Sequence, residues 1–206
     1  MRGRPLCLPN KKMASNKIGL FFGSFNPIHI GHLIIANYMA NYTDLDEVWF
    51  VVSPQNPFKV KKNLGNMYDR LEMVSLAIEG AEKLRASDVE FSLPQPSYTI
   101  DTLIHLTEKY PAKAFTLIMG EDNLTSFHKW KNADVILRDY QIIVYPRPDY
   151  DGGDLKKHPS VVVTETPVME LSSTFVRNAV KAGKSLQFYV PDKVIDFIEK
   201  KGLYLR

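Results

Sequence analysis

Short apolar runs alternate along this chain with stretches whose apolar residues recur at helical spacing. The runs at residues 18–22 and 47–53 are continuous, as expected for parallel strands buried on both faces. Strands that alternate with helices predict an α/β fold with a doubly wound parallel sheet, since parallel crossovers are right-handed. The helices from Ser172 onward are expected to form a small C-terminal helical subregion against the sheet. Further strands are predicted at residues 89–92, 114–119, 141–145 and 161–164, and helices from residue 31, at 68–86, from 97, and at 133–138, 173–182 and 191–200.

The first strand leads through a tight loop into a helix, and this junction suits a phosphate. Residues 23–27 read Gly-Ser-Phe-Asn-Pro, which is turn material. His29 and His32 stand three residues apart at the helix entrance, where both can face one pocket. The unpaired N–H groups and the dipole of a helix start attract anions, and imidazoles can donate hydrogen bonds to phosphate oxygens. Two histidines that merely cap the helix are the alternative, but the preceding residues favour phosphate binding.

Other candidate residues follow later strands, at the carboxyl edge of the sheet where α/β proteins bind ligands. Gly120 and Asp122 come after the fourth strand and suit ribose hydroxyls or a metal ion, with N-capping by Asp122 or Asn123 as the alternative. Lys59, in the loop after the second strand, either contacts phosphate or is solvated. Arg147 follows the fifth strand at the same edge.

Three residues at or near helix starts have a structural interpretation as well as a functional one. Thr99 is an expected N-cap that can also contact a ligand. Trp130 can stack on a flat heterocycle, although a lone tryptophan more often belongs to the core. Arg70, next to Asp69, is interpreted as ordinary charge in the first turn of a helix.

Composition limits the classes of protein to consider. The chain has 206 residues, of which 45% are hydrophobic, and this suits one α/β domain with a buried core. Its net charge of +3 fits small anionic substrates and does not by itself imply nucleic acid. No apolar stretch is long enough to span a membrane. Cys7 is the single cysteine, which rules out an internal disulfide and fits a reducing compartment, so a cytoplasmic location is expected. Residues 1–16 are basic, lack the apolar core of a secretory signal and are expected to form a flexible extension.

Two stretches resemble the signatures of the nucleotidyltransferase superfamily that carries a His-x-Gly-His motif. They are residues 23–32 and Leu-Ser-Ser-Thr-Phe-Val-Arg at residues 171–177, whose hydroxyls can either cap a helix or bind phosphate. Within the superfamily the chain is most similar to the bacterial nicotinate-nucleotide adenylyltransferase family. That similarity rests on residues 96–103, 118–124 with Phe127 and Trp130, 145–148, and 191–194 with the closing Leu203-Tyr204. The resemblance implies a Rossmann-like nucleotidyltransferase fold in a single domain over residues 17–206.

The resemblance also implies a reaction, in which ATP and nicotinate mononucleotide give deamido-NAD and pyrophosphate, with Mg²⁺ accompanying ATP and no metal ligand among the side chains. A carboxylate only accepts hydrogen bonds, so a pocket of donors would reject nicotinamide mononucleotide, but residue chemistry alone leaves the acid or amide choice open. The implied catalytic residues are His29, His32, Lys59 and Arg177. Implied ATP contacts are Gly23, Phe25, His29, His32, Gly120, Asp122, Arg147, Ser172, Ser173, Thr174 and Arg177. Implied mononucleotide contacts are Gly23, Ser24 and Phe25 for the phosphate, Trp130 for the pyridine ring, and Thr99 with the Lys131 amide for the carboxylate.

Other functions remain open at this point. The nearest are adenylyl transfer to nicotinamide mononucleotide or to phosphopantetheine within the same superfamily. A non-catalytic nucleotide sensor is an alternative of another class, although both signatures are intact. Neither nucleic acid nor a membrane is an expected partner, because no basic helix with interleaved aromatic residues occurs. The sequence leaves open whether the protein is a monomer or a homo-oligomer.

Overall fold

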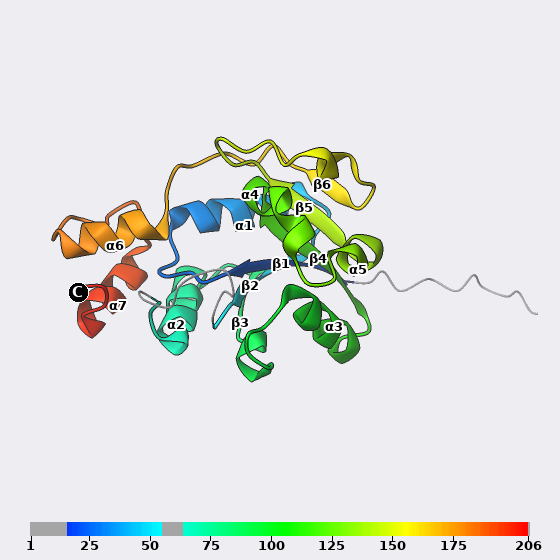
Figure 1. The fold of residues 1–206 in the computed structure, drawn as a ribbon. Helices are drawn as coiled ribbons and strands as arrows, with labels where there is room; N and C mark the ends of the chain where they lie inside the picture. Colours follow the sequence, from blue (N-terminus) through cyan, green and yellow to red (C-terminus); the bar gives the residue numbers. More distant parts are fainter. Residues whose placement is uncertain (1–15, 55–63, 206) are drawn as a thin grey trace, which may run out of the picture.

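The computed structural model describes residues 16–54 and 64–205 (Figure 1). Residues 1–15 of the expected extension lie outside the described residues, and so does Lys59. Asn16, expected in the extension, is instead the first residue of the first strand. The strands are β1 (Asn16–Gly23), β2 (Glu47–Val52), β3 (Leu84–Ser87), β4 (Lys113–Gly120), β5 (Gln141–Tyr145) and β6 (Val161–Val163). The helices are α1 (Ile30–Tyr42), α2 (Met67–Ala77), α3 (Thr99–Lys109), α4 (Glu121–Thr125), α5 (Ala133–Asp139), α6 (Ser173–Lys181) and α7 (Asp192–Lys201), with 3-10 turns η2 (Val89–Ser92), η3 (Phe127–Lys129) and η4 (Asp154–Lys157).

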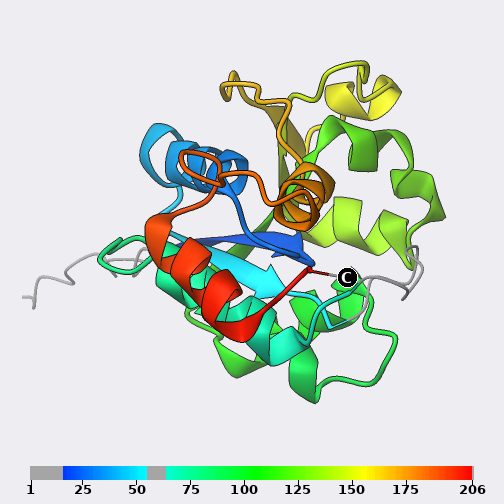
Figure 2. The ribbon, with the colours of Figure 1, turned by 90° about the vertical axis from the view of Figure 1, so that its left-hand side faces the viewer.

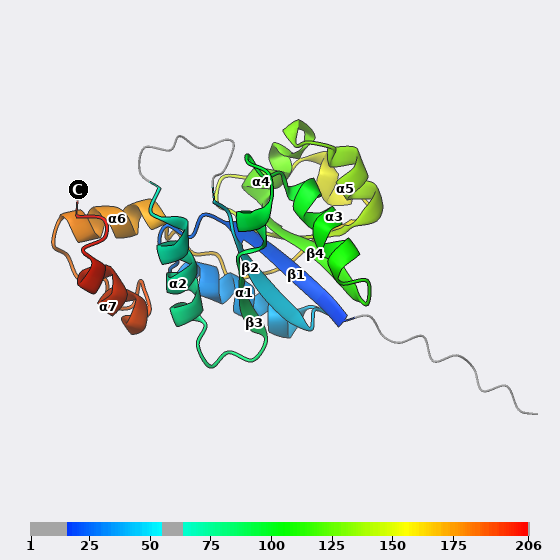
Figure 3. The same cartoon turned by 90° about the horizontal axis from the view of Figure 1, so that it is seen from below.

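The six strands form one parallel sheet in the order β3-β2-β1-β4-β5-β6, which confirms the doubly wound α/β prediction. Figure 3 shows β1, β2 and β3 next to one another at one side of this sheet. The strand order reverses at β1, which pairs with β2 on one side and β4 on the other. In such sheets the crevice beyond the carboxyl ends of the reversing strands is where ligands bind.

Alternate side chains of the strands enter two separate cores, because successive residues of a strand point to opposite faces. Ile18 and Leu20 of β1 pack with α3, α4 and α5 on one face of the sheet. Phe21 of β1 and Phe50 of β2 pack with α1, α2, α6 and α7 on the other face. The continuous apolar character of β1 and β2 therefore reflects burial on both sides, as the sequence predicts.

The C-terminal helices form the expected subregion at one end of the sheet. Figure 1 shows α6 and α7 on the side toward which the β1 arrow points, and Figure 2 looks at the molecule from that end. Helix α7 packs against α2 and buries Val194 and Ile198. The subregion therefore lies at the carboxyl edge, next to the loop that follows β1.

The segment between the second and fourth strands differs from the prediction. The helix predicted to reach residue 86 ends at Ala77, and Gly80 then adopts a φ of +81°. The third strand is Leu84–Ser87, whereas residues 89–92, predicted to be that strand, form the 3-10 turn η2. Apolar spacing misleads here because β3 is a short edge strand that is only half-buried, so its residues carry no strand signature.

None of the helices in the described ranges is both long enough and apolar enough to cross a bilayer.

Candidate active site

The loop after β1 is held in an unusual backbone conformation by a buried aromatic residue. Phe25 has a φ of +42°, and its ring packs edge-on against Phe21, Phe50 and His32. A Cβ atom on Gly23 would lie 2.6 Å from Cζ of that ring, so this position requires glycine. The loop is therefore a fixed element rather than a flexible connection between β1 and α1.

His29 and His32 meet at the start of α1, as their spacing predicts. His29 is the N-cap residue, and the two imidazoles stack with 3.7 Å between their centroids. The His29 backbone N–H donates to His32 Nδ1 at 3.3 Å, so His32 has the capping role that was the alternative to phosphate binding. His29 Nδ1 is buried without a hydrogen-bond partner among the described residues. Burial, together with the nearby Arg147 charge, lowers the pKa of His29 to about 4, and the ring is neutral at pH 7.

The second signature packs directly on the first. Ser172 is the N-cap of α6 and accepts a hydrogen bond from the Phe175 backbone N–H at 3.2 Å. The Ser173 hydroxyl donates to the Pro27 carbonyl oxygen at 2.9 Å. Arg177 donates through one guanidinium nitrogen to the Asn26 carbonyl oxygen at 2.8 Å and through another to the Thr174 hydroxyl at 3.1 Å. Two segments about 150 residues apart in sequence thus meet at the entrance of α1.

Gly120, Asp122 and Arg147 come together at the carboxyl ends of β4 and β5. Arg147 Nε lies 3.6 Å from Asp122 Oδ1, and a Cβ on Gly120 would lie 2.3 Å from that same oxygen. N-capping by Asp122 or Asn123, the alternative to ligand contact, does not occur, because the N-cap of α4 is Gly120 and no side chain caps this helix. The backbone N–H of Arg147 donates instead to the buried Glu121 carboxylate at 3.1 Å.

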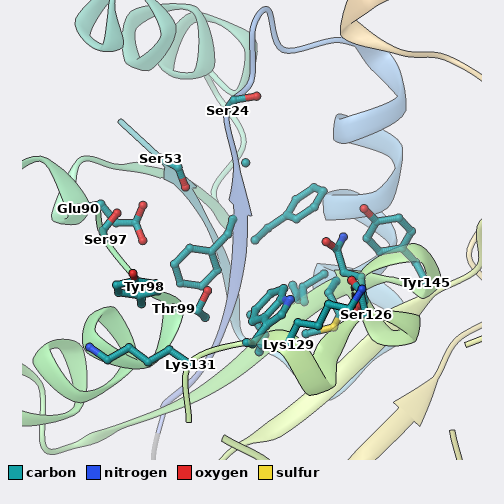
Figure 4. A pocket seen from close by; sticks show the side chains of 18 residues that line it. Ser24, Ser53, Glu90, Ser97, Tyr98, Thr99, Ser126, Lys129, Lys131 and Tyr145 are labelled. Carbon is teal, nitrogen blue, oxygen red and sulfur yellow. Dashed lines mark hydrogen bonds between the residues drawn. The ribbon is translucent and has the colours of Figure 1, made fainter. Parts of the chain in front are cut away.

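A cleft of about 450 Å³ borders the loop after β1 (Figure 4). Among the predicted mononucleotide contacts, Gly23, Ser24, Thr99, Trp130 and Lys131 line it. The described histidines, Arg147 and α6 lie outside its lining. The predicted site residues that the structure describes therefore divide into those inside the cleft and those outside it, which lie around the start of α1 and at the carboxyl ends of β4 and β5. The remaining lining residues are Phe21, Phe22, Ser53, Glu90, Ser97, Tyr98, Leu117, Ile118, Met119, Asn123, Ser126, Lys129 and Tyr145.

The structural roles of Thr99, Trp130 and Lys131 agree only in part with the predictions. Thr99 is not an N-cap: it is the first residue of α3, and Tyr98 is the N-cap. The Trp130 ring is half-buried and packs on Phe127 with 5.1 Å between centroids, so it belongs to the core and to the cleft at once. The Lys131 ammonium binds the Asp101 carboxylate at 2.9 Å, which holds the first turn of α3 near the 129–131 segment.

Arg70 is a residue whose importance the sequence interpretation missed. It is fully buried rather than a solvated helix-start charge. Its guanidinium donates to four carbonyl oxygens, those of Ser24 (2.7 Å), Ser53 (2.8 Å), Pro54 (3.0 Å) and Gly65 (3.0 Å). Burial lowers the pKa of Arg70 to about 10, so the group remains charged at pH 7. A signal was present, because Arg70 is in helical phase with the buried residues at positions 73 and 74.

Comparison with known proteins gives consistent results. The pattern of the cytidylyltransferase-like family matches residues 20–179. A probable nicotinate-nucleotide adenylyltransferase of Cytophaga hutchinsonii is 54% identical over 91% of this chain and 98% of its own, and one from Flavobacterium johnsoniae is 53% identical over the same shares. Among solved structures, Plasmodium falciparum nicotinic acid mononucleotide adenylyltransferase complexed with NaAD aligns with a TM-score of 0.79. That alignment covers 92% of this chain and 97% of the other at 23% identity, and it supports the fold.

Proposed function

Since the chain belongs to the cytidylyltransferase-like family and, within it, to the nicotinate-nucleotide adenylyltransferases, we propose how its residues divide the transfer of an adenylyl group from ATP to nicotinate mononucleotide. The products are deamido-NAD and pyrophosphate, and the reaction is a step of NAD biosynthesis. The cleft takes the mononucleotide, and the surface around the start of α1 takes ATP. The loop after β1 lies between the two substrates.

The chemistry requires position and charge rather than a strong base. A phosphate oxygen of the mononucleotide attacks the α-phosphorus of ATP, and the bond from that phosphorus to the bridging oxygen of the β-phosphate breaks. The nucleophile is already anionic, so no side chain has to remove a proton. Catalysis then depends on bringing two anionic substrates together and on stabilising the charge that develops on pyrophosphate.

The ATP half uses the two signatures. His29, whose ring is neutral at pH 7, and His32 donate to the ATP phosphates, and His32 is assigned to the developing charge. The hydroxyls at the start of α6 and the Arg177 guanidinium hold the β- and γ-phosphates, where the helix N-terminus adds its partial positive charge. Lys59, outside the described residues, is assigned to the same phosphates. Gly120, Asp122 and Arg147 line the adenosine side, where glycine allows the nucleoside to approach the backbone.

Mg²⁺ enters with ATP as part of the substrate. The described residues contain no cluster of three histidine, cysteine or acidic side chains that could hold a metal by themselves. We assign the ion to phosphate oxygens of ATP and to water, which is the usual coordination of magnesium with nucleotides. Chelation of Mg²⁺ is expected to abolish pyrophosphate release while leaving the melting temperature of the free protein unchanged.

The mononucleotide half uses the cleft. Backbone N–H groups at Gly23, Ser24 and Phe25 receive the phosphate, and the Trp130 ring stacks on the pyridine. Thr99 and the Lys131 backbone N–H donate to the carboxylate. A nicotinamide amide would bring N–H donors against these donors, and this mismatch would select the acid.

The observation that carries the proposal is the convergence of Gly23, Ser24, Thr99, Trp130 and Lys131 on one cleft. These residues come from three separate segments of the chain, and a shared ligand explains this combination of turn, helix start and aromatic ring. A phosphopantetheine enzyme would have no use for Thr99 together with Trp130.

Pyrophosphate release with ATP and Mg²⁺ tests the proposal, with nicotinate mononucleotide, nicotinamide mononucleotide and phosphopantetheine compared as second substrates. Strong preference for nicotinate mononucleotide is expected. Equal use of both mononucleotides would keep the enzyme class and overturn the assignment of Thr99 and Lys131. Preference for phosphopantetheine would overturn the substrate. ATP binding without release would identify a sensor instead.

A further inference from the structure

Glu90 is a buried carboxylic acid in the wall of the cleft, and the reaction described above does not use it. The residue belongs to η2 and is only 2% exposed. The Thr102 hydroxyl of α3 donates to Glu90 Oε1 at 2.9 Å. The hydroxyls of Ser53 and Ser97 also face this carboxyl, and Figure 4 shows Glu90 beside Ser97 with Ser53 nearby. One hydroxyl group thus donates to the Glu90 carboxyl, and those of Ser97 and Ser53 lie close to it.

Two of these three hydroxyls bracket Thr99. Ser97 lies two residues before it, in the loop that leads into α3, and Thr102 lies one helical turn after it. The Glu90 backbone also contributes, because its carbonyl oxygen accepts a hydrogen bond from the Gln95 side chain at 3.0 Å. The start of α3 is thus fixed to η2 on both sides of the residue assigned to the nicotinate carboxylate.

Ser53 extends this network to the phosphate end of the cleft. Its backbone N–H donates to the Gly23 carbonyl oxygen at 2.9 Å, and its own carbonyl oxygen accepts from Arg70 at 2.8 Å. Arg70 in turn donates to the Ser24 carbonyl oxygen at 2.7 Å. Ser53, which lies near Glu90 in the wall of the cleft, is therefore joined to the Gly23–Ser24 turn, while Glu90 itself is joined to the start of α3.

We propose that Glu90 is a positioning residue that determines the preference for the acid over the amide mononucleotide, by holding Thr99 at a fixed distance from the phosphate end of the cleft. The proposal rests on the function proposed above. Selection between a carboxylate and an amide depends on placing donors at hydrogen-bond length, and a small displacement of Thr99 removes this selection. Glu90 acts through Thr99 and touches no reacting atom.

Burial and hydrogen bonding act on the Glu90 carboxyl in opposite directions, and substitutions can change the hydrogen bonds separately. Burial is the largest influence on this carboxyl and raises its pKa, while the three surrounding hydroxyls lower it by a smaller amount. Glutamine keeps the size and one acceptor oxygen but replaces the other acceptor by a donor. Glu90→Gln should therefore keep part of these side-chain contacts, Glu90→Ala should lose all of them, and Thr102→Val should lose the hydrogen bond between Thr102 and Glu90 alone.

The test compares KM for each substrate and the ratio of kcat/KM for the acid and amide mononucleotides. For Glu90→Ala we expect about a tenfold rise in KM for nicotinate mononucleotide and a similar fall in the acid-to-amide ratio, as for the loss of one or two hydrogen bonds, with KM for ATP within about twofold. Glu90→Gln and Thr102→Val should change the same quantities in the same direction by less. If the acid-to-amide ratio stays within about twofold of wild type in all three variants, the proposal is wrong.

Glu121→Gln is the matched control, because Glu121 is also a buried carboxylate at the carboxyl edge but lies on the ATP side. It binds the Arg147 backbone N–H and the Lys156 ammonium, so its loss should raise KM for ATP and leave the acid-to-amide ratio unchanged. A fall of that ratio in Glu121→Gln as large as in Glu90→Gln would show a general loss of structure and overturn the proposal. Should Glu90→Ala not fold, the two milder variants decide the question. If the wild type does not turn over nicotinate mononucleotide, the proposed function itself fails. If the wild type does turn it over and the variants keep its acid-to-amide ratio, only the role of Glu90 fails.

Discussion

At the scale of single residues, His32 caps the start of α1 in the structure and is assigned a catalytic role in the proposed function. Its Nδ1 accepts the His29 backbone N–H, which orients the ring at the start of α1. We predict that His32→Ala lowers kcat by about 100-fold or more, as the loss of a donor to developing charge does in other enzymes. Turnover is measured by pyrophosphate release, and a thermal melt shows whether the variant is folded. A folded His32→Ala protein with wild-type turnover would remove His32 from the mechanism.

His29 gives the free protein a dependence of stability on pH. The pKa of its imidazole is 6.5 when unfolded and about 4 when folded, so between these values the unfolded chain binds a proton that the folded protein does not. Lower pH then favours unfolding, and the contribution of neutral His29, about 3 kcal/mol, is lost as pH falls from 6.5 to 4. We predict that His29→Gln reduces the loss of unfolding free energy over this range, measured with urea at several pH values.

The exposed His128 supplies the control for this experiment. His128→Gln should keep the pH dependence of the wild type. A wild-type slope in His29→Gln would mean that another group causes the acid sensitivity.

At the scale of secondary-structure elements, α2 contributes to the site through one inward residue. Arg70 connects the ends of β1 and β2 to the loop before α2 by its four hydrogen bonds. We predict that Arg70→Met lowers the unfolding free energy by about 3 kcal/mol or more, because it leaves buried carbonyl oxygens without donors. The unfolding free energy of Arg70→Lys should lie between those of the wild type and Arg70→Met, since an ammonium keeps some donors but cannot reproduce the planar fork of the guanidinium. Chemical denaturation measures both, and a loss below about 1 kcal/mol in Arg70→Met would contradict this account.

The elements also show which features of the fold the sequence could predict. Strands β1, β2, β4 and β5 were predictable because burial on both faces leaves long apolar runs. Strand β3 was not, since an edge strand needs few apolar residues and Leu84 continues the helical spacing of α2. The same limit applies to Glu90, whose side-chain partner lies 12 residues away, and to the four partners of Arg70, which lie up to 46 residues away, although the helical phase of Arg70 did indicate its burial.

The candidate site was predictable where chemistry follows a motif and unpredictable where it follows from packing. The histidines were found from their spacing, the hydroxyls at the start of α6 from their place in a predicted first turn and from the resemblance to the second signature, and the structure brings the two segments together. The capping role expected of Thr99 was wrong, because the chain enters α3 one residue earlier than the hydroxyl suggested. The network through Ser53 joins strand ends by backbone groups, which every residue possesses, so no side chain marks it in the sequence.

At the scale of the whole molecule, the C-terminal subregion closes over the loop that begins the site. Arg177 of α6 holds the carbonyl oxygen of Asn26, and the Tyr204 hydroxyl after α7 donates to the side-chain oxygen of the same residue at 2.9 Å. The Gly65 backbone N–H donates to that oxygen as well, at 3.1 Å. Asn26 is therefore the residue where the loop after β1, the loop before α2 and the C-terminal end of the described chain meet.

This closure predicts an effect of a change far from the substrates in sequence. Burial raises the pKa of Tyr204, so its hydroxyl remains a donor throughout the neutral range. Tyr204→Phe removes only that donor while Asn26 keeps its bond from Gly65, so we expect a loss of about 1 kcal/mol in unfolding free energy. We also expect a higher KM for ATP, because the loop that Arg177 and Tyr204 hold borders the ATP phosphates in the proposed site. Tyr42→Phe is the matched control, since Tyr42 is 72% exposed on α1 and should change neither quantity. If the two variants cannot be distinguished by denaturation and by ATP kinetics, the C-terminal subregion covers the site without stabilising it.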